Sequence, residues 1–166
     1  MLPIFVVMGV SGCGKSTVGQ QLASTLNVEF LEGDQLHSDQ NVARMAAGIA
    51  LTDEDRQGWL ETLARRIDDA RSSGKGLVVS CSALKRAYRD TLRQGAADLR
   101  FVHLQGSPAL LLARMASRPG HYMPASLLES QLATLEVPDP DENAQTCDTA
   151  LPASAIVAAV MAGVSR

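Results

Sequence analysis

A glycine-rich loop between an apolar run and an amphipathic segment constrains the fold more than any other feature. Residues 9–16 read Gly-Val-Ser-Gly-Cys-Gly-Lys-Ser and match the pattern GxxxxGK[ST] at every fixed position. Residues 4–8 have the composition of a strand buried on both faces, and apolar residues recur every four positions after Lys15. A strand before the loop and a helix after it are the context that phosphate binding requires, so we predict a phosphate-binding loop (P-loop) here rather than a chance match in a turn.

Each part of this loop has an expected chemical role. The glycines let the backbone wrap around a phosphate, and successive amides donate hydrogen bonds to it. Lys15 is predicted to span the β- and γ-phosphates of ATP as a catalytic cation, and Ser16 to be a ligand of Mg²⁺. Cys13 is expected to act through its amide rather than its thiol. The predicted nucleotide-binding residues are Gly9, Val10, Ser11, Gly12, Cys13, Gly14, Lys15, Ser16 and Thr17.

The rest of the chain alternates between strand-like and helix-like segments. Apolar runs at 28–31, 77–79 and 101–104 are predicted as strands, and the segments around 52–74, 84–93 and 154–164 as helices, the first of them opened by a capping box. Further helices are predicted after Ser107 and after Pro124. Such alternation predicts a three-layer α/β fold with a parallel sheet. The length of 166 residues fits one domain, 1–166, since domains average about 150 residues.

Charge and cysteine content disfavour several classes of protein. The chain has 15 Lys and Arg against 18 Asp and Glu, with no basic run, which disfavours a nucleic-acid-binding surface. The three cysteines, Cys13, Cys81 and Cys147, are widely spaced and predict neither a disulfide framework nor a zinc site. The apolar opening at 2–8 is too short to span a membrane. We therefore expect a cytoplasmic protein with reduced thiols that binds neither nucleic acid nor membranes.

Polar residues that follow the predicted strands indicate an acceptor site. Asp34 comes directly after the second strand, so a parallel sheet would bring it to the edge where the P-loop lies. There it is predicted to orient an acceptor hydroxyl and take its proton, although capping a helix is the alternative role. For each arginine, a solvated helix face is the alternative. The residues predicted with Asp34 to bind an anionic, hydroxyl-rich substrate are His37, Arg44, Arg56, Lys85 and Arg89, with Lys85 the first choice for a carboxylate.

A third group of residues suggests a lid over the transferred phosphate. Arg114, Arg118 and His121 lie near a Pro-Gly pair between two predicted helices, a pattern similar to the mobile lid of small kinases. We predict a lid at about 114–137, with Arg118 as the catalytic cation that stabilises the transition state. His121 is predicted to contact the substrate or to serve the structure of the lid.

Several segments together resemble the gluconokinase family of small P-loop kinases. Besides the P-loop they are GDQLH at 33–37, LTDEDR at 51–56, SCSALKRAYR at 80–89 and GHYM at 120–123, and the resemblance runs from about residue 4 to 143. It implies a nucleoside-monophosphate-kinase-like fold with a five-stranded parallel sheet, ATP and Mg²⁺, transfer to the 6-hydroxyl of D-gluconate, and a homodimer.

Two alternatives stay open at this point. A shikimate kinase has a similar size and an Asp after its second strand, but the Gly-Gly-Gly segment typical of that family is replaced here by residues 80–82, Ser-Cys-Ser. A nucleotide-binding module without catalytic turnover is the other alternative.

Overall fold

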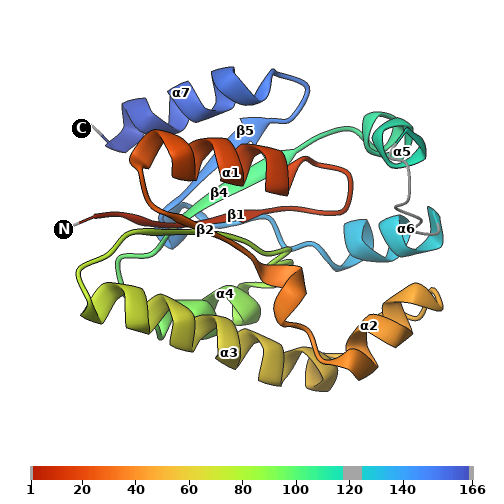
Figure 1. Ribbon diagram of the computed structural model, residues 1–166. Coiled ribbons are helices and arrows are strands. Elements are labelled where there is room, and N and C mark those ends of the chain that lie inside the picture. The colour runs from red at the N-terminus through yellow and green to blue at the C-terminus, as the bar shows by residue number, and fades with distance from the viewer. Residues whose placement is uncertain (1, 118–124, 165–166) are drawn as a thin grey trace.

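The computed structural model describes residues 2–117 and 125–164, which form one five-stranded parallel sheet covered by helices on both faces (Figure 1). The strands are β1 (Ile4–Met8), β2 (Glu29–Glu32), β3 (Leu77–Ser80), β4 (Arg100–Gln105) and β5 (Ala144–Asp148), in the spatial order β2-β3-β1-β4-β5. All four neighbouring pairs are parallel. The predicted three-layer α/β fold with a five-stranded parallel sheet is therefore confirmed.

The helices form two covering layers and a third group beyond the strand ends. Helices α1 (Lys15–Leu26) and α7 (Ala153–Val164) cover one face, and α3 (Asp53–Ser72) and α4 (Arg86–Arg93) cover the other (Figure 1). Helices α2 (Asp39–Ala46), α5 (Pro108–Ala116) and α6 (Ala125–Thr134) lie beyond the carboxyl ends of the strands. Two short 3-10 helices, η1 (Gly33–Leu36) and η2 (Pro140–Glu142), complete the described elements. None of the described helices is long and apolar enough to cross a membrane.

Local sequence signals account for several element boundaries. Every residue of β1 is buried, as a continuous apolar run predicts. The capping box at the start of α3 is present: the amide of Asp55 donates to the Thr52 hydroxyl at 3.1 Å, and the amide of Thr52 donates to the Asp55 carboxylate at 2.9 Å. Ser107 caps α5 in a similar way, through the amide of Leu110 at 3.2 Å. These caps satisfy amides that the first turn of a helix leaves unpaired.

Two elements, β5 and α2, lack the apolar pattern from which the other strands and helices were predicted. Strand β5 reads Ala-Gln-Thr-Cys-Asp, and only Cys147 is buried, because the strand lies at the edge of the sheet and packs little of its surface. It pairs with β4 from Phe101 opposite Ala144 to Gln105 opposite Asp148. Helix α2 is also mostly polar, with Asn41 as its buried residue. β5 is held by its pairing with β4, and α2 by contacts of Asn41 and Arg44 with Asp55 of α3.

The sheet register brings three strand ends together. Ser80, at the end of β3, lies beside Val7 of β1 on one side and Glu32 of β2 on the other. The P-loop follows β1, and Gly33 and Asp34 follow β2. Residues that are far apart in the sequence therefore meet at the edge where ligands bind in folds of this kind.

Candidate active site

The P-loop lies between β1 and α1. Gly14 precedes the helix with a φ of 90° and no side chain to cap it, so the amides of the first turn remain available to an anion. A Cβ on Gly12 would lie 2.8 Å from the carbonyl oxygen of Leu111, which leaves no room for another residue. The Lys15 ammonium lies over its own loop and donates to the carbonyl oxygens of Gly9 at 3.1 Å and Val10 at 3.2 Å. Both acceptors are neutral, so the charge of Lys15 is not compensated by a carboxylate within the described chain.

Glu32 adds a carboxylate that sequence reasoning missed. Its two oxygens accept hydrogen bonds from the hydroxyls of Ser16 and Ser80. Ser80 also lies 3.4 Å from the amide of Gly33, which donates to its hydroxyl oxygen. Glu32 could have been predicted from the sequence. It is the last residue of the strand that precedes Asp34, and the carboxyl ends of parallel strands meet at the edge where ligands bind.

Asp34 lies in the turn after β2 and lines the same cleft as the P-loop. It is exposed, and its carboxylate makes no hydrogen bond or ion pair with another described residue, although its carbonyl oxygen accepts from the amide of His37 at 3.3 Å. The turn that carries it is held by Trp59, whose indole Nε1–H donates to the carbonyl oxygen of Gly33 at 2.8 Å. Trp59 itself is buried in the core. The Asp34 carboxylate is therefore fixed in place by its backbone and open to a ligand.

His37 lies in the same turn as Asp34, between Trp59 and Asn41. Its ring stacks on Trp59, with 4.0 Å between the ring centroids. The Asn41 side-chain amide donates to the carbonyl oxygen of Asp55 at 2.7 Å, so its other hydrogen points to Nδ1 of His37, 3.3 Å away. Burial lowers the pKa of His37. The nearby charge of Asp34 raises this pKa and that of Arg56 lowers it, but burial has the largest effect. The neutral ring thus carries its proton on Nε2 and can donate it in a hydrogen bond.

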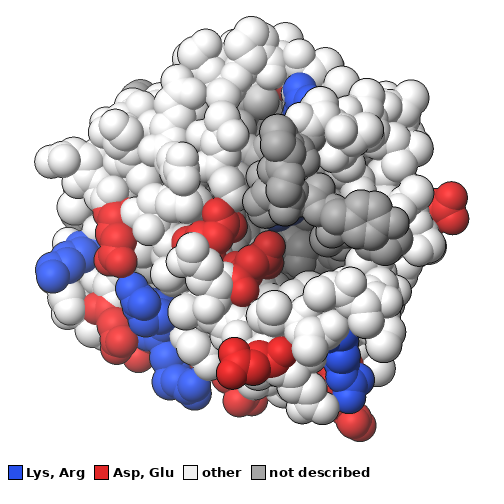
Figure 2. Space-filling model, turned by 45° about the vertical axis from the view of Figure 1, so that its right-hand side comes forward, with Lys and Arg blue, Asp and Glu red and all other residues white. Residues whose placement is uncertain are grey.

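The predicted substrate cations differ in their partners. Arg44 pairs with Asp55 at 3.2 Å, and Lys85 pairs with Asp53 at 3.1 Å. The hydrogen bond to Asp53 raises the pKa of Lys85. Figure 2, in which the right-hand side of Figure 1 comes forward, shows acidic and basic side chains next to one another on this face. For both Arg44 and Lys85, an anionic substrate would have to compete with a carboxylate already in place.

Arg56 is different, because its described partner is neutral. The half-buried guanidinium donates from Nη1 to the Tyr88 hydroxyl at 3.0 Å and lies 5.4 Å from the centre of the Tyr88 ring. The Tyr88 hydroxyl in turn donates to the Asp53 carboxylate. No carboxylate among the described residues forms an ion pair with Arg56, so its positive charge is available to a ligand.

Arg89 corrects one sequence prediction. Its side chain is completely buried, with Nε 2.6 Å and Nη2 3.1 Å from the Glu142 carboxylate. Its Nη1 donates at 2.8 Å to the carbonyl oxygen of Ala83, a residue in the left-handed region with a φ of 47°. A side chain without solvent access and with a buried counter-ion does not reach a soluble substrate. Arg89 instead supports the loop that follows β3, so its assignment as a substrate ligand was wrong.

A cleft of about 970 Å³ runs along the carboxyl edge of the sheet, and Asp34 lines it whereas His37, Arg44, Arg56 and Lys85 do not. Asp34 and Glu32 line one end, the P-loop lines the middle, and Leu151, Pro152 and Ile156 line the other end. Arg114 also lines the cleft and donates to Thr149, from Nη1 to the hydroxyl at 2.8 Å and from Nη2 to the carbonyl oxygen at 2.6 Å. Arg118 and His121, predicted for the lid, lie outside the described residues.

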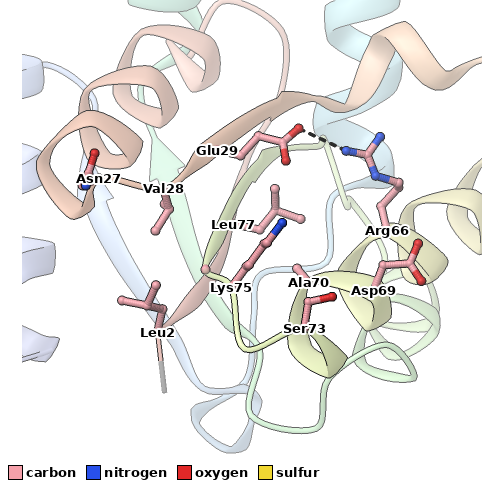
Figure 3. Close-up of a pocket in the computed structure, with 11 residues that line it drawn as sticks. Leu2, Asn27, Val28, Glu29, Arg66, Asp69, Ala70, Ser73, Lys75 and Leu77 are labelled. Atoms are coloured by element: carbon pink, nitrogen blue, oxygen red, sulfur yellow. Dashed lines mark hydrogen bonds and ion pairs between the residues drawn. The ribbon is translucent and has the colours of Figure 1, made fainter.

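A second hollow, of about 350 Å³, lies at the opposite edge of the sheet, where β2 and β3 begin and α3 ends. Figure 3 shows Leu2, Val28 and Leu77 around it, with Lys75 among them. The ion pair between Glu29 and Arg66, 3.1 Å long, lies at its side (Figure 3). None of the predicted site residues lines this hollow.

Comparison with known proteins identifies the family. Residues 4–138 match the sequence family described as an AAA domain. A gluconokinase from Gluconobacter oxydans (strain 621H) is 51% identical over 137 residues, which cover 82% of this chain and 77% of that protein. The chain belongs to the gluconokinase family. The predicted family resemblance is thereby confirmed.

Solved structures of other proteins have the same architecture. A gluconokinase from Sinorhizobium meliloti 1021 superposes with a TM-score of 0.90 at 47% identity, covering 99% of this chain and 93% of that one. An unliganded sugar kinase from Janibacter sp. HTCC2649 has a TM-score of 0.95 at 44% identity, covering 99% and 95%. A shikimate kinase from Acinetobacter baumannii reaches a TM-score of 0.59 at 24% identity, which indicates a common fold and nothing more specific. The similarity thus favours the gluconokinases over the shikimate kinases.

Proposed function

We propose that this protein transfers the γ-phosphoryl group of ATP to the 6-hydroxyl of D-gluconate and so produces 6-phospho-D-gluconate. The observation that carries the proposal is the single cleft that joins a P-loop to Asp34, in a chain 51% identical to a gluconokinase. Most of the catalysis then comes from positioning the two substrates and from stabilising charge on the transferred group.

The nucleotide occupies the middle and the apolar end of the cleft in this proposal. The phosphates bind the P-loop amides, and Lys15 exchanges its bonds to Gly9 and Val10 for bonds to phosphate oxygens. The base lies against the apolar side chains of Leu151, Pro152 and Ile156. Arg114 supplies a further positive charge beside the loop. Arg118 stays a predicted transition-state cation in the predicted lid.

Ser16 and Glu32 fit a magnesium ion. Mg²⁺ prefers oxygen ligands and in kinases is held by one or two protein groups together with the phosphates of the substrate. The Ser16 hydroxyl and the Glu32 carboxylate are hydrogen-bonded to each other beside the loop, which provides such a pair of oxygens. When bound, the ion neutralises charge on the β- and γ-phosphates. Ser16 is the predicted direct ligand, and Glu32 holds its hydroxyl toward this position.

Asp34 and its neighbours receive the acceptor. The Asp34 carboxylate orients the 6-hydroxyl and takes its proton as the phosphoryl group arrives. The Nε2–H of His37 donates to another hydroxyl of the sugar acid. We assign the substrate carboxylate to Arg56 in place of Lys85, because Arg56 forms no ion pair with a described carboxylate and donates to a neutral hydroxyl, whereas Lys85 already pairs with Asp53. Arg44 remains a weaker candidate for the same reason as Lys85.

An acceptor panel tests the proposed function. ADP release is measured with D-gluconate, shikimate and glucose at the same ATP and Mg²⁺ concentrations, and the product is identified by mass spectrometry. We expect gluconate to be strongly preferred. Preference for shikimate would overturn the assignment of the acceptor. ATP binding without turnover on any acceptor would favour the nucleotide-binding module instead.

Two broader expectations accompany this function. A kinase that uses ATP and a metabolic sugar acid works where both are available, so we propose that the protein acts in the cytoplasm. The homodimer implied by the family resemblance stays a prediction, which light scattering of the purified protein measures directly.

A further inference from the structure

Thr149 joins three segments of the nucleotide cleft through one buried side chain. The residue follows β5 directly and is only 2% exposed. Its hydroxyl donates to the carbonyl oxygen of Cys13 in the P-loop and accepts from Nη1 of Arg114 on α5 at 2.8 Å. Its own carbonyl oxygen accepts from Nη2 of Arg114 at 2.6 Å. The P-loop, α5 and the loop after β5 therefore meet at this residue.

The position of the hydroxyl is determined on all sides. The amide of Thr149 donates to the carbonyl oxygen of Gln105 at 2.9 Å, which fixes its backbone to the end of β4. The methyl group packs against Gly106, where an added Cβ would come within 2.5 Å of it. A β-branched side chain has few rotamers, and here one branch has an apolar neighbour while the other has two polar partners. The hydroxyl cannot exchange places with the methyl group without losing both polar contacts.

The hydrogen bond from Thr149 to the Cys13 carbonyl oxygen also determines where the amide of Gly14 points. The peptide bonds of the described chain are all trans, so the C=O of Cys13 and the N–H of Gly14 point in opposite directions. By fixing the carbonyl oxygen, Thr149 directs the Gly14 amide away from itself. No hydrogen bond within the described part of the chain uses that amide. Gly14 lies at the start of α1, where such a free donor contributes to anion binding.

The same contacts hold Arg114 without neutralising it. Both oxygens of Thr149 are uncharged acceptors, and Arg114 forms no ion pair with a carboxylate of the described chain. The ideal Cβ position of Gly14 lies 3.9 Å from Nη1 of Arg114, so the guanidinium stands beside the loop. A fixed, uncompensated positive charge next to free amides suits a polyphosphate.

We propose that Thr149 is a positioning residue of the ATP site, which orients the Cys13–Gly14 peptide toward the phosphates and fixes Arg114 beside them. The inference rests on the proposed function, because ATP is the ligand whose binding it affects. Thr149 touches neither the acceptor side nor Asp34, so its influence is confined to the nucleotide half of the cleft. Sequence reasoning offered no signal for it, because a lone Thr after a polar edge strand has no motif.

Two matched pairs of variants isolate the hydroxyl. Thr149→Val keeps the shape of the side chain and removes the hydroxyl. Thr149→Ser keeps the hydroxyl and removes the methyl group, and Thr149→Ala differs from Thr149→Ser by the hydroxyl alone. The dissociation constant of ATP is measured by calorimetry without gluconate, and the KM values of ATP and gluconate are measured in the coupled assay. Melting temperatures show whether each variant is folded.

We expect both variants without the hydroxyl to bind ATP about tenfold more weakly than their partners with it, with the KM of gluconate changed less than about twofold. Thr149→Ser should remain within about twofold of the parent in ATP affinity. Equal ATP affinity across all four proteins would overturn the proposal. So would Thr149→Ser binding as weakly as Thr149→Val, since the methyl contact would then be responsible. Because calorimetry needs no turnover, the result on Thr149 is independent of whether gluconate is the acceptor.

Discussion

The hydroxyl of Ser16 donates a hydrogen bond to the carboxylate of Glu32 across the gap between α1 and β2. Glu32→Gln should therefore raise the Mg²⁺ concentration needed for half-maximal activity by about 10- to 100-fold, because groups that orient a metal ligand affect metal affinity on this scale. The KM of gluconate should change little. Glu29→Gln, at the exposed start of the same strand, is the control. An unchanged magnesium dependence would remove Glu32 from the metal site.

Replacing Lys15 should abolish phosphoryl transfer. Lys15→Ala removes the ammonium that neutralises phosphate charge, and we expect turnover to fall at least about 100-fold. The fold should be preserved, because the described contacts of the ammonium are with its own loop: the carbonyl oxygens of Gly9 and Val10 and the sulfur of Cys13. Circular dichroism checks the fold, and Lys75→Ala, far from the cleft, is the matched control. Turnover within a few fold of the parent would contradict the role of Lys15.

Asp34→Asn should separate binding from chemistry. The amide still forms a hydrogen bond with the acceptor hydroxyl but no longer takes its proton, so kcat should fall by about 10²- to 10⁴-fold with the KM of ATP nearly unchanged. Steady-state kinetics with both substrates varied measures this. If the variant raises only the KM of gluconate, Asp34 positions the substrate and is not the base.

Replacing Arg56 should raise the KM of gluconate more than replacing Lys85 does. Arg56→Met should raise the KM of gluconate by about tenfold or more, since a hydrogen-bonded charge is lost, and ATP affinity should stay the same. Lys85→Met should have a smaller effect, because Lys85 already pairs with Asp53. Arg56→Lys, which keeps the charge but not the planar geometry, should be intermediate. A larger effect of Lys85→Met would return the carboxylate site to Lys85.

The buried pair of Arg89 and Glu142 should contribute to stability. Arg89→Met leaves the Glu142 carboxylate without its main partner, and we expect the free energy of unfolding to fall by about 3–5 kcal/mol. The double variant Arg89→Met/Glu142→Leu should lose less, because no buried charge remains. Urea unfolding measures both. A double variant as unstable as the sum of the two single variants would show that the charges are not coupled.

The same pair predicts how stability depends on pH. Burial by itself would raise the pKa of Glu142, but hydrogen bonds from Arg89 and Arg93 outweigh it and lower the pKa to about 2, from 4.5 in the unfolded chain. A carboxyl group with a lowered folded-state pKa stabilises the fold above its unfolded pKa, and this contribution is lost as the pH falls from 4.5 toward about 2. The double variant should therefore lose less stability than the parent between pH 5 and 3.

The P-loop was predictable because its function is encoded locally. Its donors are successive amides of one short loop, so the spacing of Gly9, Gly14 and Lys15 specifies both the conformation and the ligand. Asp34 was predictable for a related reason, since the carboxyl ends of parallel strands meet at one edge whatever the details of packing. The family resemblance rested in addition on longer segments, among them LTDEDR at 51–56 and SCSALKRAYR at 80–89.

Only the tertiary structure determines which charged side chains form ion pairs and which polar groups form hydrogen bonds with each other. Arg89 and Glu142 are 53 positions apart, and Thr149 and Cys13 are 136 apart, so no local pattern links either pair. From the sequence, Arg56, Lys85 and Arg89 were all predicted to bind the substrate. In the structure, Arg56 donates to the neutral hydroxyl of Tyr88, Lys85 pairs with the exposed carboxylate of Asp53, and Arg89 pairs with the buried carboxylate of Glu142. The energy of a charge depends on its burial and on its nearest partners, and only the packed chain sets both.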